Sequence, residues 1–155
     1  MNPNADGKWR YCLFDLDWAF FNDTDSIGRW LTPGGMGTNK GTDNTLFIAL
    51  MKNATFRDRF LTVFGEKLAA DWSTTTVTQK FTQRYNELLS EIPRHMERWP
   101  EWTQKTLNTQ LSKLGAFAKE RPAKIIAYTR DALDLSDADL EKYFGEAIRV
   151  IQDTA

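Results

Sequence analysis

The sequence predicts a mainly α-helical domain with one short N-terminal strand and a glycine-rich loop. Two observations lead to this fold class: apolar residues recur at helical spacing through residues 43–152, whereas only residues 8–18 alternate as a strand does. The 155 residues, 41% of them hydrophobic, suffice for one globular domain. We therefore expect a single domain over residues 1–155, with the strand at 8–18, the loop at 24–42 and the helices at 43–152.

The predicted strand ends in two carboxylates. Successive side chains of an extended segment point to opposite faces, so Asp15 and Asp17 share one face. Such a pair can bind one hard cation, and magnesium is commonly held by one or two carboxylates together with substrate phosphates. The same acids could instead cap the following loop, and the spacing alone leaves both interpretations open. Asp15 and Asp17 are thus the candidate metal ligands.

The region after this pair has the composition of a connector. Residues 24–42 are rich in Gly, Thr, Asn and Asp, and they lack the Lys-Ser/Thr ending of a phosphate-binding loop. Cys12 is the only cysteine and lies in an apolar run, which indicates a buried structural thiol. The net charge of −1 and the short apolar runs argue against a nucleic-acid partner and against a membrane span.

Six helices are predicted in the remainder of the chain, each from an apolar stripe and its flanking cap or proline. The first three are a helix at residues 44–52, a helix capped by Asn53 or Thr55 with Phe56, Phe60, Val63, Phe64 and Leu68 inward, and a helix at 75–92 that is capped by Ser73 and ended by Pro93. The fourth runs from about Pro100 to Lys119 with Leu107, Leu111, Leu114 and Ala118, and the fifth begins at Pro122 with Ile125, Ile126, Thr129 and Leu133 inward. The last begins at Ser136, where Asp139 completes the cap, and has Leu140, Phe144, Ala147, Ile148 and Ile151 inward.

The single strand lacks an obvious partner. One strand cannot satisfy its own backbone N–H and C=O groups, and the sequence contains no good second strand. We expect the partner to come from an upstream segment of a longer protein, from another copy, or from the stretch near Trp30 and Leu31. If the partner strand comes from an upstream segment, we expect this chain to be a fragment that carries half of the candidate metal site.

Four segments, in order, resemble the spore-coat CotH kinase family. They are WRYCLFDLDWAF at residues 9–20, LFIALMKNATFRDRF at 46–60, EIPRHMERW at 91–99 and FAKERP at 117–122. The resemblance extends over about residues 8–133. It implies the helical C-terminal lobe of a kinase-like fold, beginning just before the metal-binding D-x-D segment.

The resemblance also implies an activity and its cofactors. Family members are atypical protein kinases, so ATP would donate its γ-phosphoryl group to Ser/Thr hydroxyls of a protein substrate, with Mg²⁺ or Mn²⁺ held at Asp15 and Asp17. Asp15 is the slightly favoured primary ligand. The nucleotide-binding lobe and the catalytic aspartate precede this segment in the family, so we expect the upstream lobe as a partner, weak ATP binding and no activity in this chain alone. The resemblance further implies a spore-coat, secreted or cell-surface location. The alternative is a non-catalytic helical module for assembly or attachment.

Other polar and aromatic residues have simpler interpretations. For His95 we expect local packing rather than catalysis. Arg94, Arg98 and Arg121 fit solvated helix ends better than a phosphate-binding cluster. The aromatic pair around Pro100, Trp99 and Trp102, indicates a packed helix junction.

Overall fold

The computed structural model describes residues 19–20, 24–35 and 44–154, and these form seven helices with no strand among them. The helices are α1 (Ile27–Leu31), α2 (Thr45–Met51), α3 (Ala54–Ala69), α4 (Thr74–Leu88), α5 (Ile92–Arg98), α6 (Gln104–Leu133) and α7 (Asp137–Asp153). The predicted mainly α-helical fold class is confirmed. The predicted strand at 8–18 lies outside the described residues.

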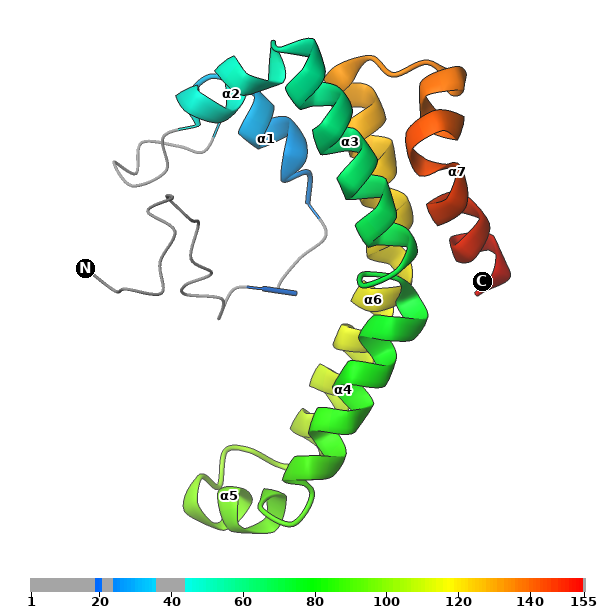
Figure 1. The fold of residues 1–155 in the computed structure, drawn as a ribbon. Coiled ribbons are helices and arrows are strands. Elements are labelled where there is room, and N and C mark those ends of the chain that lie inside the picture. The colour runs from blue at the N-terminus through cyan, green and yellow to red at the C-terminus, as the bar shows by residue number, and fades with distance from the viewer. Residues whose placement is uncertain (1–18, 21–23, 36–43, 155) are drawn as a thin grey trace, which may run out of the picture.

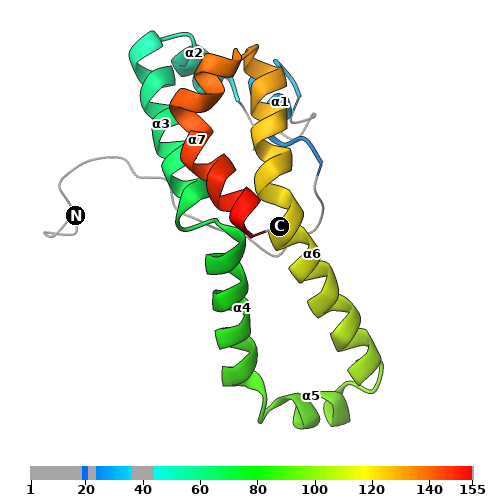
Figure 2. The ribbon, with the colours of Figure 1, turned by 90° about the vertical axis from the view of Figure 1, so that its right-hand side faces the viewer.

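The helices separate into two regions, which we call the body and the arm (Figure 1). The body consists of α1, α2, α3, α7 and residues 118–133 of α6. The arm consists of α4, α5 and residues 104–117 of α6, and α5 joins the two long helices at its tip. Figure 2 shows α4 and α6 spreading apart toward α5.

The hydrophobic core lies in the body. Its buried members come from α1, α3, α6, α7 and the α6–α7 connection: Ile27, Leu61, Leu68, Ile125, Ile126, Leu135, Phe144 and Ala147. Of the inward residues predicted for the last two helical segments, Ile125, Ile126, Thr129, Phe144 and Ala147 are buried. The other four, Leu133, Leu140, Ile148 and Ile151, are partly buried against the core. Neither α4 nor α5 contains a buried residue.

Helix α3 buries a line of residues that shares only Leu68 with the predicted one. Leu61, Gly65 and Leu68 are its buried residues, whereas Phe60 and Phe64 are half-buried at the edge of the core. Gly65 allows the closest approach to α7: a Cβ atom there would overlap the carbonyl oxygen of Tyr143. A glycine adds no apolar signal to a sequence pattern, so the pattern placed the packing face too near the phenylalanines.

Three N-terminal caps agree with the sequence. The side chains of Asn53 and Ser73 accept hydrogen bonds from the N–H groups of Phe56 and Thr76, which are among the first orphan donors of α3 and α4. Ser136 and Asp139 form a reciprocal capping box at the start of α7.

Helix α6 is continuous across Pro122, where the sequence predicted two helices. A proline in a helix interior leaves the carbonyl of residue i−4 without its N–H donor. Here that carbonyl belongs to Ala118, and the Thr74 hydroxyl at the start of α4 donates to it at 3.0 Å. Pro122 itself is buried. A side chain from another helix thus replaces the missing bond, and the helix continues.

Helix α1 lies within the segment that was predicted to be a loop over residues 24–42. That prediction is wrong for Ile27–Leu31, and residues 36–43 lie outside the described part. Ile27 is buried. The Asn44 side-chain amide donates to the carbonyl oxygens of Trp30, in the last turn of α1, at 2.9 Å and of Thr32, just after it, at 2.8 Å. Because Trp30 and Leu31 are helical, this stretch does not provide a partner strand.

The remaining boundary differences occur near prolines. Helix α4 ends at Leu88, and Pro93 lies in the first turn of a separate helix, α5, instead of ending a longer one. The following helix begins at Gln104, capped by Thr103, rather than near Pro100.

Candidate functional site

The described residues that are nearest in sequence to the candidate metal ligands lie at the junction of arm and body. Asp15 and Asp17 themselves lie outside the described residues, and Ala19 and Phe20 are the described residues that follow them. The candidate site is therefore the group of residues around Phe20.

Phe20 lies between the two long helices of the arm. Its ring centroid is 5.0 Å from that of Phe81 on α4 and 5.2 Å from that of Phe117 on α6, both in edge-to-face geometry. The backbone of Phe20 has a φ of 61°, in the left-handed region. A bulky side chain there costs about 1–2 kcal/mol, which the two ring contacts help to offset. The position of Phe20 is therefore specified by tertiary contacts.

An apolar cavity of about 370 Å³ adjoins Phe20. Its lining residues come from the start of the chain, from α3 and the turn after it, and from both arm helices: Phe20, Ser26, Phe64, Leu68, Trp72, Val77, Phe117, Ala118, Arg121, Pro122 and Ile125. Arg121 is the only charged residue among them. Such a cavity can accommodate apolar groups, and it offers no carboxylate for a metal ion.

Arg121 secures the chain beyond Phe20. Its guanidinium donates to the Thr24 carbonyl oxygen at 2.9 Å and to the Ser26 hydroxyl at 2.7 Å. The same group lies 5.8 Å from the Phe117 ring centroid. Arg121 is thus occupied in holding residues 24–26 against α6, which the sequence did not indicate.

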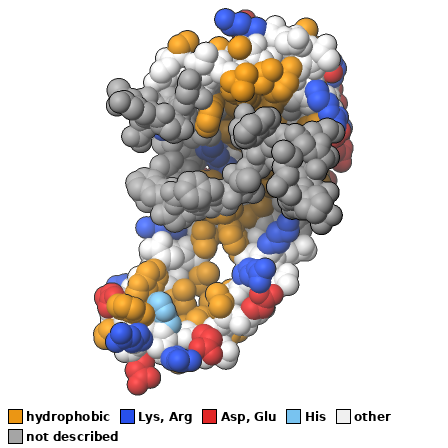
Figure 3. Space-filling view, turned by 60° about the vertical axis from the view of Figure 1, so that its left-hand side comes forward, with side chains coloured by type: hydrophobic (Ala, Val, Ile, Leu, Met, Phe, Trp, Pro, Cys, Tyr) orange, Lys and Arg blue, Asp and Glu red, His pale blue; other side chains and the backbone are white. Residues whose placement is uncertain are grey.

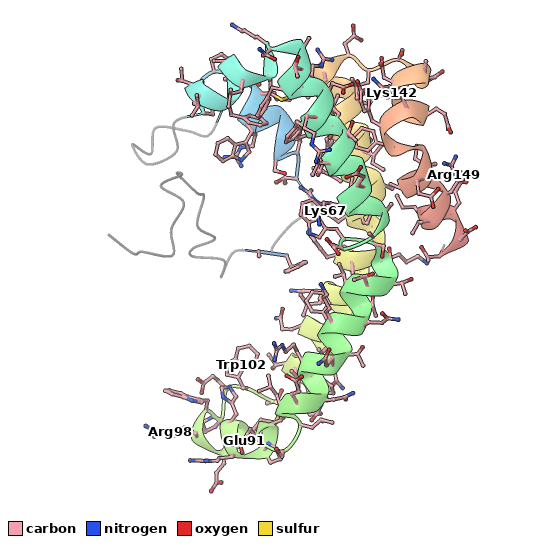
Figure 4. All side chains as sticks on the ribbon, in the orientation of Figure 1. Lys67, Glu91, Arg98, Trp102, Lys142 and Arg149 are labelled. Atoms are coloured by element: carbon pink, nitrogen blue, oxygen red, sulfur yellow. The ribbon has the colours of Figure 1, made fainter. Side chains whose placement is uncertain are left out.

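The other two arginines of the considered cluster belong to α5. The Nη1 atom of Arg94 lies 3.6 Å from Oε2 of Glu91, and the Cζ atom of Arg98 lies 5.3 Å from the centroid of the Trp99 ring. Figure 4 shows Arg98 and Trp102 at the tip of the arm. Residues 104 and 121 of α6 are about 25 Å apart along the helix axis, so Arg121 is remote from that tip. The three arginines do not form a phosphate-binding cluster.

Residues near Pro100 form a loose junction. The backbone N–H of Trp102 donates to the backbone carbonyl oxygen of Trp99 at 2.9 Å, yet the indoles of Trp102 and Trp99 are 41% and 48% exposed. His95 meets Trp102 edge to face, with ring centroids 6.0 Å apart. The local packing expected for His95 is present, and the expected helix junction at Trp99 and Trp102 leaves both indoles partly exposed.

The acids with shifted pKa values are not among the residues that line the cavity. Hydrogen bonds from Lys142 and Tyr143, both on α7, hold the pKa of Asp58 on α3 below its usual value. Lys67 similarly lowers the pKa of Asp71, and Ser136 that of Asp139. These are surface pairs and a helix cap. Within the described ranges, no group of three His, Cys, Asp or Glu side chains is placed to hold a metal ion.

Comparison with known families decides the classification. The family described as CotH kinase protein matches residues 2–125, which include the D-x-D segment, the arm and most of the junction. This chain belongs to the CotH kinase family. No curated protein and no solved structure matched it. Membership supports a kinase-like function with a protein substrate and with nucleotide and metal dependence, and CotH proteins are associated with the spore coat. No described helix has the length and apolar character needed to cross a membrane.

Proposed function

We propose that this CotH chain supplies the helical lobe of an atypical protein kinase that transfers phosphate from ATP to Ser/Thr hydroxyls. The observation that supports this most is the family match over residues 2–125, because it includes both carboxylates of the D-x-D pair and the helices that flank Phe20. The association of CotH proteins with the spore coat suggests that the acceptor is a coat or cell-surface protein.

Asp15 and Asp17 would hold Mg²⁺ or Mn²⁺, with Asp15 as the preferred primary ligand. Two carboxylates are suitable ligands for a hard cation, which would neutralise charge on the ATP phosphates. The described residues near this pair would help to position the two carboxylates. Asp17 precedes Phe20 by three residues, so its Cα atom lies within about 11 Å of the Phe20 Cα atom. Phe20 and Arg121 would then restrain the chain that carries the ligands.

This chain by itself should bind ATP weakly and transfer no measurable phosphate. Phosphoryl transfer depends on groups placed on both sides of the nucleotide, and the described cavity offers Arg121 as its only charged group. The upstream lobe of the family would supply the others. Phosphorylated product from incubation of the chain with ATP, Mg²⁺ and a generic protein acceptor would contradict this expectation.

Metal binding is testable without activity. Paramagnetic Mn²⁺ bound at Asp15 and Asp17 should broaden the amide signals of Phe20 and of residues 24–26 in NMR spectra. The Asp15→Asn and Asp17→Asn variants should lose this effect, while Asp131→Asn, a control that alters an exposed acid on α6, should keep it. Equal broadening in all four proteins, or none in the unmodified chain, would refute the metal site.

A non-catalytic interaction module is the second candidate. The arm favours it, because Leu88, Leu89, Trp99 and Trp102 are exposed, at 58%, 46%, 48% and 41%. Four of the eight exposed large apolar side chains of the described residues lie in the arm, and a group of such side chains is typical of interaction surfaces. A chain that binds neither Mn²⁺ nor ATP but keeps its helical structure would support this second function.

A further inference from the structure

The inner side of the arm carries an apolar stripe on each of its long helices. Phe81 and Tyr85 recur at a spacing of four on α4, and Leu107, Leu111 and Leu114 recur at spacings of four and three on α6. These residues are half-buried, and Leu88 beyond them is 58% exposed. Figure 3 shows hydrophobic side chains gathered over the arm, beside the single histidine. Helices with such stripes normally bury them against a third element.

Phe20 already occupies the base of this surface. Its ring contacts Phe81 and Phe117, one from each helix, so the surface accepts an apolar side chain from the N-terminal part of the chain. Beyond Phe20 the two stripes continue toward α5 through Tyr85 and Leu111, which are half-buried.

The residues before Phe20 have the matching pattern and length. Phe14, Leu16, Trp18 and Phe20 alternate with Asp15 and Asp17, as expected of a segment with one apolar and one acidic face. Leu16 precedes Phe20 by four residues, a reach of about 13 Å, while Leu111 precedes Phe117 by about 9 Å along α6. The segment can therefore cover the stripe.

Charge favours this occupant over a second copy. Residues 74–117 contain six Lys or Arg and four Asp or Glu, whereas residues 9–18 contain Arg10, Asp15 and Asp17. Two arms face to face would bring together surfaces of like net charge, while the segment has the opposite sign.

We propose that Phe14, Leu16 and Trp18 dock on the apolar stripe between α4 and α6, continuing the contact made by Phe20 and directing Asp15 and Asp17 away from the arm. The docking does not require a metal ion, so it can fail or succeed independently of the proposed metal site. It assigns the arm a positioning role for the D-x-D segment.

A disulfide test locates the segment directly. In a Cys12→Ser background, Leu16→Cys is combined with Leu111→Cys on the stripe or with Gln110→Cys, an exposed neighbour pointing about 100° away around α6. A disulfide requires Cα atoms within about 7 Å, so the first pair should oxidise at least tenfold faster, within one chain, in metal-free buffer. Equal rates, no disulfide, or predominantly intermolecular disulfides would overturn the proposal, the last in favour of a second copy.

Hydrogen exchange provides an independent measurement that needs no added cysteine. Leu16→Lys should accelerate amide exchange in α4 and in residues 104–117 by about tenfold, because the docked segment no longer covers them. Asp17→Asn changes the charge by the same amount on the opposite face and should leave this exchange unchanged. Unaltered exchange in Leu16→Lys, or the same acceleration in both variants, would also overturn the docking.

Discussion

The body and the arm share helix α6 but are stabilised in different ways. In the body, α3 and α7 approach closely around Gly65, and Phe144 and Ala147 have no exposed surface. In the arm, α4 and α5 bury no residue, and four large apolar side chains near the tip are exposed. Burial of apolar surface is the dominant favourable term in folding. The body therefore has the means to fold by itself, whereas the arm depends on its connection to the body and on whatever covers its stripe.

Truncation of one side chain in each region should show the largest contrast. Phe144 is fully buried against Phe64, so Phe144→Ala should lower the free energy of unfolding by about 3–5 kcal/mol. Leu88 in the arm is 58% exposed, and Leu88→Ala should change the free energy of unfolding by less than about 0.5 kcal/mol. Urea denaturation monitored by circular dichroism measures the unfolding free energies of the two variants. Similar losses would show that the arm is as well packed as the body.

The same chemical change at two glycines should have opposite signs. A Cβ at Gly65 in α3 would overlap the Tyr143 carbonyl oxygen, so Gly65→Ala must push α7 away and should cost about 2–3 kcal/mol. Gly115 in the arm has nothing within 4 Å of its Cβ position, so Gly115→Ala should stabilise the helix by about 0.5–1 kcal/mol. Thermal unfolding of the two variants provides the comparison. A loss of stability in Gly115→Ala would mean that a segment outside the described residues contacts the arm at Gly115.

The link between arm and body at Pro122 should have an intermediate effect. Thr74→Val removes the hydroxyl that bonds the Ala118 carbonyl and should cost about 1–2 kcal/mol. In a Pro122→Ala background the restored amide N–H can serve this carbonyl, so the same Thr74→Val change should cost less. A double-mutant cycle from denaturant unfolding measures the difference. Additive effects would mean that the threonine does not compensate for the proline.

The smallest effect is expected on the body surface, and it depends on pH. Because the pKa of Asp58 is lowered from its ordinary value of 3.8 by Lys142 and Tyr143, its ionised form favours the folded state. That contribution is complete above about pH 4–5 and disappears as the pH falls through the lower, folded-state pKa. Melting temperatures of Asp58→Asn and of the unmodified chain should therefore differ at pH 6 and converge toward pH 2. A constant difference at all pH values would exclude this ionisation as its cause.

The sequence allowed much of the body to be predicted and less of the junction. The apolar spacing around Phe144 and the Ser136–Asp139 cap are local signals, and both are confirmed. Phe20 carries no comparable signal, since an aromatic residue after an acidic pair does not reveal which rings it will contact. The amphipathic spacing of Ile27, Trp30 and Leu31 could have indicated α1, but the surrounding Gly and Thr concealed it. The candidate metal pair remains a prediction from the sequence and from the family.

What the sequence by itself determined are the features that depend on neighbours within a few residues: the mainly helical class, most helix positions, the caps at Asn53, Ser73 and Ser136, and the family to which the chain belongs. The tertiary structure alone decided the continuity of α6 across Pro122, the contact at Gly65 and the anchoring of residues 24–26 by Arg121. In each of these cases the deciding partner is more than 40 residues away in sequence, so neither local periodicity nor local propensity carries information about it.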